Sequence, residues 1–376
     1  MNRRLLIVVL LLAALAALSS PSFGGNERVE RTIRHEAQTR AGRPILVENL
    51  IGSLTVRAGE TRGKTLVEAR IVVEAESKDV ARELAESIVL STPSEDGRST
   101  IRVGYPLERH SAFRLPRSEK DGFLDKWVTP FVRKSTVAAV YDGRTVEVGQ
   151  AKGAAAIAVH LAVTVPLDVQ VSCKQVVGSL HVVGVRGSFT LEAVEGQILA
   201  EQIYGALDVR TGGGEVLVRK FNGKEFRLQT GSGNVTLVEI QADQATLLAS
   251  SGKIEGQAIT TGKLDVDSGA GPVRLTDIDA ESLTVDSESG AIDVAARITR
   301  TREASIQSAD GDVTLRVNRT TPFELRAASE AGSVKHRDLA AEVVDEEKNS
   351  LHLVRGKGGA ALSVTTGKGE VVVCSI

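Results

Sequence analysis

The chain has 376 residues, with 46 Lys or Arg against 48 Asp or Glu, a formal net charge of −2, and only 3% aromatic residues. This near balance of charge gives no electrostatic reason to expect binding to nucleic acid or to an anionic membrane. Six of the twelve aromatic residues lie within residues 105–141.

The first residues resemble a secretory signal peptide over residues 1–24. Arg3 and Arg4 precede an unbroken apolar run from Leu5 to Leu18, and small or turn-forming residues follow up to Gly24. An uncleaved membrane anchor is the alternative, but this run falls short of the ~20 residues that span a bilayer. We expect cleavage near Gly24, no later membrane span, and a periplasmic, cell-envelope or extracellular location.

Residues 44–104 predict a small β-β-α-β cap. Strand-like alternation covers 45–56, broken at Gly52, and recurs over 66–75. Ser77 is a suitable N-cap for an amphipathic helix over 78–90, and a strand returns over 99–103. The polar stretch before residue 43 has no predicted element. Such a cap would cover the first strand edge of a repeat stack.

Residues 105–150 form an insert that is rich in aromatic and basic residues and ends in a predicted hairpin around Asp142-Gly143. One interpretation is a partner-binding segment, because aromatic and Arg side chains dominate interface hot spots. The other is a hydrophobic cluster folded over the repeat stack. Both remain open, and the candidate partner-binding residues are Trp127, Phe131, Arg133 and Tyr141.

Residues 152–376 carry a repeat marked by glycine. The spacing is 18 to 21 residues until a final gap of 37, and the glycines are Gly178, Gly196, Gly214, Gly233, Gly252, Gly271, Gly290, Gly311, Gly332 and Gly369. The residues two after, five before and seven before each glycine are all apolar. The pattern predicts an all-β fold, a right-handed β-solenoid (parallel β-helix or roll) with coils of about 19 residues.

The coils are expected to follow one another in chain order to the C-terminus, with the charged excursion 340–348 replacing one regular coil. Cys173 then lies inward in the first coil and Cys374 after the last. About nine coils at ~4.8 Å each would separate them far beyond the ~7 Å Cα limit of a disulfide. The two cysteines are therefore not expected to pair.

Six aspartates fall on neighbouring coils: Asp265, Asp267, Asp277, Asp279, Asp286 and Asp293. Stacked carboxylates can bind a hard cation or act as an acid–base pair on a glycan. A solvated acidic face, partly neutralised by Lys253, Lys263 and Arg274, is the simpler interpretation. The histidines have no metal-ligand spacing and no phosphate-binding loop is found, so no metal, cofactor or catalytic residue is predicted.

The chain resembles a known bacterial family through several motifs: Gly-Ser-Leu-Thr-Val at 52–56, Val-Pro at 165–166, Val-Gly-Ser-Leu at 177–180, and the Ser-Gly-x-Ile turns at 251–254 and 289–292. They are similar to the family known as "putative adhesin", a domain of unknown function built as a β-solenoid. The resemblance covers roughly residues 44–104 and 152–376, and it implies no catalytic residues. The insert departs from the family's pattern.

Three functions remain open. The first is a secreted or envelope-associated, non-enzymatic binding or structural module whose partner is an unidentified macromolecule, an envelope protein or a polysaccharide. The second is a polysaccharide-active β-helix enzyme, although sugar clefts usually need aromatic stacking platforms and only five aromatic residues lie outside the insert in the mature chain. The third is a structural solenoid that polymerises end to end, which the signal peptide and the N-terminal cap disfavour.

Overall fold

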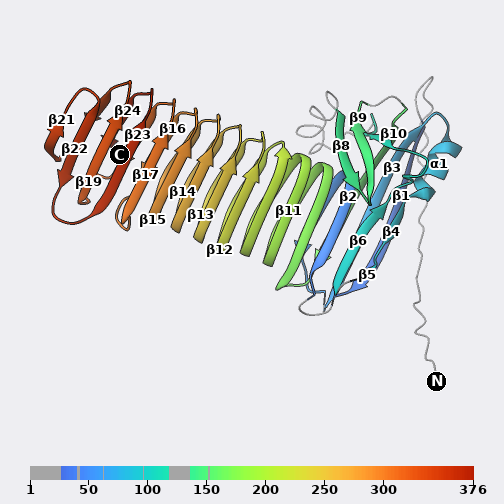
Figure 1. The fold of residues 1–376 in the computed structure, drawn as a ribbon. Coiled ribbons are helices and arrows are strands. Elements are labelled where there is room, and N and C mark those ends of the chain that lie inside the picture. The colour runs from blue at the N-terminus through green and yellow to red at the C-terminus, as the bar shows by residue number, and fades with distance from the viewer. Residues whose placement is uncertain (1–26, 40–42, 62, 96, 118–135, 151–152) are drawn as a thin grey trace. The chain divides into compact units, whose positions relative to one another are not determined.

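The computed structural model describes residues 27–39, 43–61, 63–95, 97–117, 136–150 and 153–376. The chain divides into two compact units, Met1–Ser179 and Leu180–Ile376, and each is described by itself. Strands dominate both (Figure 1), and the predicted all-β class is confirmed. The predicted signal peptide lies outside the described residues.

The first unit contains a mixed sheet, in which two antiparallel pairings are followed by two parallel ones. β1 (Glu27–Gln38) pairs antiparallel with β3 (Lys64–Ala75), β3 pairs antiparallel with β10 (Ala155–Val165), and β10 pairs in parallel with β2 (Ile45–Ala58). β6 (Arg98–Gly104) continues in parallel beside β2. Strand β1 was missed by the sequence analysis. Its residues are almost all half-buried or exposed, so it lacks the apolar alternation that identifies a strand.

The cap helix α1 is Lys78–Ser87, close to the predicted range. Ser77 caps its start by accepting a hydrogen bond from the Val80 amide (3.3 Å). Arg31 of β1 donates to the carbonyls of Ala85 (3.0 Å) and Ile88 (3.1 Å), which satisfies carbonyls that the end of the helix leaves open. No helix within the described residues is long and apolar enough to cross a membrane.

The remaining short strands of this unit are β4 (Val89–Ser91) and β5 (Ser94–Glu95), which pair antiparallel with β6, and β7 (Ala112–Arg114), which pairs with β10. β8 (Thr136–Tyr141) and β9 (Arg144–Gly149) form the hairpin predicted at Asp142-Gly143. Both turn residues have positive φ, 49° and 73°, as a tight hairpin turn requires. β11 (Val169–Gly213) begins here and continues into the second unit.

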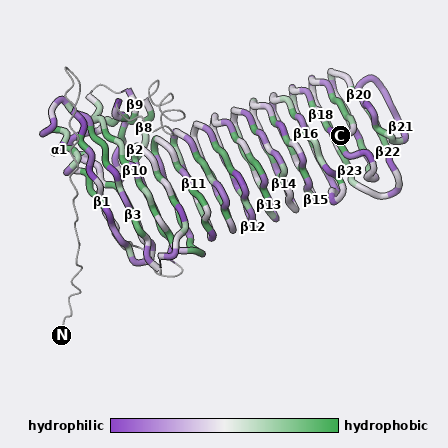
Figure 2. Tube along the Cα trace, turned by 180° about the vertical axis from the view of Figure 1, so that it is seen from behind, coloured by the Kyte–Doolittle hydropathy of each residue, from purple (hydrophilic) through white to green (hydrophobic). Residues whose placement is uncertain are grey.

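The second unit is a stack of parallel coils. After β11 come four strands of 15 residues, each paired in parallel with the next at the same register: β12 (Val216–Thr230), β13 (Val235–Ala249), β14 (Ile254–Ser268) and β15 (Val273–Ser287). Inward residues such as Val266 and Val285 are buried, and apolar and polar residues alternate along each strand (Figure 2). The right-handed winding stays a prediction.

Two corners close each regular coil. At one, the repeating glycine approaches the coil below so closely that a Cβ on Gly271 would lie 1.7 Å from the carbonyl oxygen of Gly252. At the other, the strand bends at one residue with φ between 55° and 58°, a conformation that costs energy outside glycine. These residues are Lys220, Glu239, Ala258 and Asp277. The sequence analysis predicted the glycine corner and missed the second one, which no residue type marks.

The coils become wider after β15. β16 (Ile292–Ala296) and β17 (Glu303–Ser308) are separated by a turn, and two extra residues enter there: Leu275 pairs with Val294, whereas Ser282 pairs with Glu303. β18 (Val313–Val317), β19 (Phe323–Ser329) and β20 (Val334–Arg337) continue the chain. The 21-residue spacing of the later glycines follows from these longer turns.

The spatial order of the last coils departs from the chain order that the sequence analysis expected. β23 (Ala360–Thr366) lies between β17 and β19 and pairs in parallel with both. β24 (Val371–Ser375) lies likewise between β18 and β20. The C-terminal coil is therefore inserted beneath the coil that precedes it in sequence. The expectation failed because a repeat motif marks a coil without specifying which neighbour it stacks on.

An antiparallel hairpin closes the end of the stack. β22 (Ser350–Arg355) pairs antiparallel with β19, and β21 (Glu342–Glu346) pairs antiparallel with β22. This hairpin contains most of the charged excursion, which the sequence analysis had assigned in place of a coil. It covers the edge of β19 that would otherwise expose unpaired backbone groups.

Candidate functional site

A groove of about 870 Å³ lies along the outer face of the terminal coils in the second unit. Its floor is one column of outward residues in register, which belong to β14, β15, β17, β23 and β19 in that spatial order: Asp267, Asp286, Gln307, Thr365 and Ala328. The adjoining turns supply its wall. The inserted C-terminal coil therefore contributes the fourth of these five floor positions, Thr365.

The groove is strongly acidic. Its lining includes the carboxylates of Asp267, Asp286, Glu288, Asp310 and Glu330, against one amine, Lys368. Lys368 is engaged by Asp310 at 2.8 Å. Within the part of the chain that the structure describes, the other four carboxylates are in no ion pair. This leaves a row of negative charge with no internal counter-charge.

Asp286 shows the electrostatic consequence of this crowding. Partial burial, together with the negative charges of Asp267 and Asp265, raises the pKa of its carboxyl above the ordinary value. Asp267 is the register partner of Asp286 on the next coil, so the two carboxylates share one column at the strand spacing of ~4.8 Å. A cation placed between them would relieve this repulsion.

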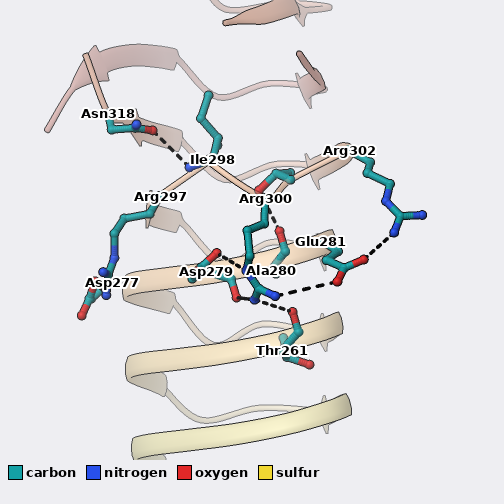
Figure 3. Close-up of polar contacts among 11 residues, drawn as sticks. Thr261, Asp277, Asp279, Ala280, Glu281, Arg297, Ile298, Arg300, Arg302 and Asn318 are labelled. Carbon is teal, nitrogen blue, oxygen red and sulfur yellow. Dashed lines mark hydrogen bonds and ion pairs between the residues drawn. The ribbon is translucent and has the colours of Figure 1, made fainter. Parts of the chain in front are cut away.

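The other predicted aspartates do not face this groove as free charges. Asp277 pairs with Arg297, Asp279 with Arg300 (3.0 Å), and Glu281 with Arg302 (2.6 Å), all at the wide turn between β16 and β17 (Figure 3). Arg300 also donates to the backbone carbonyls of Asp279 (3.0 Å) and Thr261 (3.4 Å). These arginines fasten the first wide turn to the two coils below it.

Asp293 and Asp265 are also neutralised, by Arg316 and by Lys263 (2.7 Å) respectively. The acidic cluster of the sequence analysis thus separates into paired residues and the Asp267–Asp286 pair. Among the described residues, no group of three or more His, Cys, Asp or Glu side chains could hold a metal ion. Both cysteines are free thiols, and burial raises the pKa of Cys173 to about 12.

Of the four insert residues proposed as partner contacts, the structure describes Tyr141. Trp127, Phe131 and Arg133 lie outside the described residues. Tyr141 is buried, and its hydroxyl donates to the carbonyl of Val103 (2.7 Å). Burial raises its pKa well above the ordinary value. Tyr141 therefore occupies the interior of the first unit and offers no exposed ring to a partner.

Tyr141 belongs to an aromatic cluster with two other residues of the insert. Its ring lies edge-on to Tyr105 (5.7 Å between centroids), which in turn lies edge-on to the fully buried Phe113 (5.6 Å). Tyr105 donates a hydrogen bond to the buried Asn49 (2.8 Å). For these three residues the packing interpretation of the insert is the one that the structure supports.

Sequence reasoning also missed a column of hydroxyls three residues before the glycines. Ser308 accepts from the Gly311 amide (2.9 Å) and donates to the Gly290 carbonyl of the coil below (3.2 Å). Ser329 and Thr366 do the same at the terminal coils. The fixed offset from glycine is a sequence signal that could have revealed these residues, of which Ser308 and Thr366 line the groove.

Comparison with known proteins gives one family match. Residues 196–373 match the family described as "Toastrack DUF4097". No curated protein matches the chain. Solved structures give distant likenesses. A "putative adhesin" from Parabacteroides merdae ATCC 43184 is 10% identical, with 77% of this chain and 96% of that chain covered and a TM-score of 0.38.

Two further solved structures have similarly low sequence identities and TM-scores. A "putative adhesin" from Bacteroides fragilis NCTC 9343 is 13% identical, covers 92% of this chain and 97% of its own, and has a TM-score of 0.31. A "putative lipid binding protein" from Parabacteroides distasonis ATCC 8503 is 13% identical, covers 90% and 96%, and has a TM-score of 0.32. At these values the function has to be inferred from this chain's own residues.

Proposed function

We propose that this chain, whose residues 196–373 match the Toastrack DUF4097 family, is an exported, non-enzymatic binding protein of the cell envelope or cell surface. In this proposal its ligand is an extended basic polypeptide segment that lies in the acidic groove. The observation that carries it is the set of four unpaired carboxylates facing one hollow, Asp267, Asp286, Glu288 and Glu330. Export is supported by the basic and apolar pattern of residues 1–24.

The lining of the groove favours a peptide over a glycan. It contains small and hydroxyl-bearing residues such as Ala309, Ala331 and Thr366, and no aromatic side chain on which a sugar ring could stack. Five coils at ~4.8 Å give the groove a length of roughly 20 Å, which matches about six residues of extended peptide at ~3.3 Å each. Alternate lysine or arginine side chains would then face the carboxylates.

Exposed ion pairs are individually weak, at about 0.2–1 kcal/mol each. Three pairs lost together amount to about 1.5 kcal/mol, which is roughly a tenfold change in affinity. The interaction is also expected to weaken with salt, because the groove is open and its charges are screened.

The test measures binding of a fluorescent alternating Lys–Ser dodecapeptide to the full chain by anisotropy. The groove variant Asp267→Asn/Asp286→Asn/Glu288→Gln should bind about tenfold more weakly. The matched control, Glu239→Gln/Asp243→Asn/Glu347→Gln, removes the same charge from exposed residues that do not line the groove. An equal loss in both variants would show that net charge, and not the groove, controls binding.

A second candidate function is glycan hydrolysis at the same groove. Asp286, whose carboxyl pKa is raised by partial burial and by the charges of Asp267 and Asp265, lies beside the carboxylate of Asp267, and glycosidases work with such carboxyl pairs. Release of reducing ends from bacterial or plant polysaccharides, abolished in Asp286→Asn, would establish this activity. The absence of aromatic residues from the groove lining makes it the weaker candidate.

The insert remains an independent candidate for partner binding through Trp127, Phe131 and Arg133. Deleting residues 105–150 would remove the buried Tyr105, Phe113 and Tyr141 and would disrupt the first unit. Trp127→Ala is the cleaner test. If the insert binds, capture of an envelope partner should fall while the melting temperature holds, and a lower melting temperature with undiminished capture would assign Trp127 to packing.

End-to-end polymerisation is the third possibility that the sequence left open. The antiparallel hairpin β21–β22 covers the outer edge of β19, so a second stack would have to join at a different strand. Light scattering against concentration tests it, since an open-ended polymer grows without limit.

A further inference from the structure

The C-terminal coil occupies a slot between two coils that precede it in the chain. β23 hydrogen-bonds to β17 on one edge and to β19 on the other, and β24 does the same between β18 and β20. The glycine corner repeats this order. A Cβ on Gly369 would lie 2.2 Å from the Gly311 carbonyl oxygen, and one on Gly332 would lie 2.1 Å from that of Gly369.

The C-terminal coil is buried in the slot and hydrogen-bonded to both neighbouring coils. Leu362, Val364, Val371 and Val373 are buried at 3% exposure or less. Thr366 donates to the Gly311 carbonyl below it (2.8 Å), and Ser329 above donates to the Gly369 carbonyl (2.8 Å). An empty slot would therefore expose apolar side chains and two unpaired strand edges, both of which favour recruitment of another strand.

The order of the strands in the sequence favours a folding intermediate in which the slot is empty. The coil of β19 and β20 is complete before residue 360 is reached, and it carries the same glycine spacing and hydroxyl column as the coils before it. Nothing in its motif distinguishes stacking directly on β17 from stacking on β23. The C-terminal coil must enter between two coils that are already formed.

The connection into the slot is short, exposed and rich in glycine. It runs from Arg355 over Pro322 to Ala360, so that β22 and β23 flank β19 on opposite sides. Gly356, Gly358 and Gly359 all have positive φ, and a Cβ on Gly359 would lie 2.2 Å from the Pro322 carbonyl oxygen. Short, constrained hinges of this kind favour exchange of the following element between copies, because the exchanged form straightens the hinge.

We infer that β23 and β24 can exchange between two copies of this chain, each C-terminal coil filling the other's slot. An exchanged dimer keeps every contact of the slot and changes only the hinge at residues 356–359, which is why such exchange costs little at equilibrium. The partner is a second copy of this chain. In the dimer, Thr365 and Lys368 in each groove come from the other copy, so the dimer has two composite grooves.

The test uses register partners on the outer face, Gln307 of β17 and Thr365 of β23. One full chain carries Gln307→Cys and the other Thr365→Cys, both in a Cys374→Ser background. The two are unfolded, mixed, refolded together at high concentration and oxidised. A disulfide between the two chains is expected, with a dimer peak in light scattering that increases with refolding concentration.

Two matched proteins make the result decisive. The single chain with both Gln307→Cys and Thr365→Cys should cross-link within a monomer, and failure to do so would overturn the register on which the inference rests. Gln229→Cys, an exposed residue on β12, replaces Gln307→Cys to measure random collision. The yield of inter-chain disulfide with Gln307→Cys should be at least about tenfold higher than with Gln229→Cys. A strand bound in the slot holds the two thiols at a high effective concentration.

Inter-chain product no greater than the Gln229→Cys control would overturn exchange. Deleting Lys357 and Gly358 gives a second, independent readout, because the shortened hinge cannot cross back over Pro322 within one chain. This variant should shift from monomer to a closed dimer. A folded monomer would contradict the inference directly.

Discussion

The regular coils of β12–β15 and the terminal coils of β17–β24 use the same motif, yet they are assembled differently. In the regular coils each strand pairs with the next one in the chain, and every coil turns at one residue with positive φ. In the terminal coils the turns are wider and the last coil is inserted out of order. A repeat motif therefore fixes the shape of a coil, whereas its neighbours are decided by chain connections and the ends of the stack.

The largest expected effect comes from a buried charge in a regular coil. Val266 is 2% exposed between two neighbouring coils, so Val266→Asp places an unpaired carboxylate in the core. We expect loss of most folded protein, measured as soluble yield and by thermal melting. Asp267→Ser, the adjacent outward residue, should stay within ~0.5 kcal/mol of the wild type. Equal tolerance of the two changes would contradict the inward and outward assignment.

The same change in the inserted coil should act more locally. Val364 is fully buried, but its coil has only the coil of β19 and β20 and the terminal hairpin beyond it. Because each repeat contacts only its neighbours, Val364→Asp should release the terminal coils and leave β12–β15 folded. Hydrogen exchange by mass spectrometry should show protection lost after residue 302 and retained over 216–287. Uniform loss of protection would mean that the whole stack unfolds as one unit.

A smaller effect is expected for the hydroxyl that ties the outermost coil to the inserted one. Ser329 accepts from the Gly332 amide (2.9 Å) and donates to the Gly369 carbonyl (2.8 Å). Ser329→Ala leaves both groups without this partner, at a cost of about 1–2 kcal/mol. We expect faster amide hydrogen exchange, confined to β19–β24. Ser363→Ala on the outer face of β23 serves as the control and should leave exchange unchanged.

The junction between the two kinds of coil depends on Arg300, which joins the first wide turn to the two coils below (Figure 3). Arg300→Ala should cost about 1 kcal/mol, mainly from the hydrogen bonds to backbone carbonyls. Arg302→Ala should cost less than ~0.5 kcal/mol, because its single pair with Glu281 is largely exposed to solvent. Urea unfolding of both variants would show whether Arg300→Ala lowers the free energy of unfolding more than Arg302→Ala does.

The smallest effect concerns pH. The pKa of Asp286 is raised in the folded protein, mainly by partial burial and then by Asp267 and Asp265. A raised carboxyl pKa disfavours the folded state above that pKa, and the penalty is relieved as pH falls through it. Asp286→Asn should therefore melt slightly higher than the wild type at pH 7, with the difference shrinking toward pH 4. A difference that grows in acid would contradict the assigned direction.

The sequence by itself determined the coil. The glycines, the three apolar positions around them, the helix after Ser77 and the Asp142-Gly143 turn are local signals, and each is found in the structure. The sequence predicted only part of the groove. The sequence indicated the aspartates, but it could not separate Asp267 and Asp286 from Asp277 and Asp279, whose arginine partners lie about 20 residues away across a turn.

What only the tertiary structure decided was which coil lies beside which. β1 is a strand because it pairs with β3, not because its own residues alternate. The segment 360–375 carries the same repeat motif as its neighbours, and its place beneath β19 follows from the antiparallel hairpin and the glycine hinge before it. Side-chain period and turn chemistry act over a few residues, whereas strand neighbours depend on pairing across the whole fold, which no local pattern encodes.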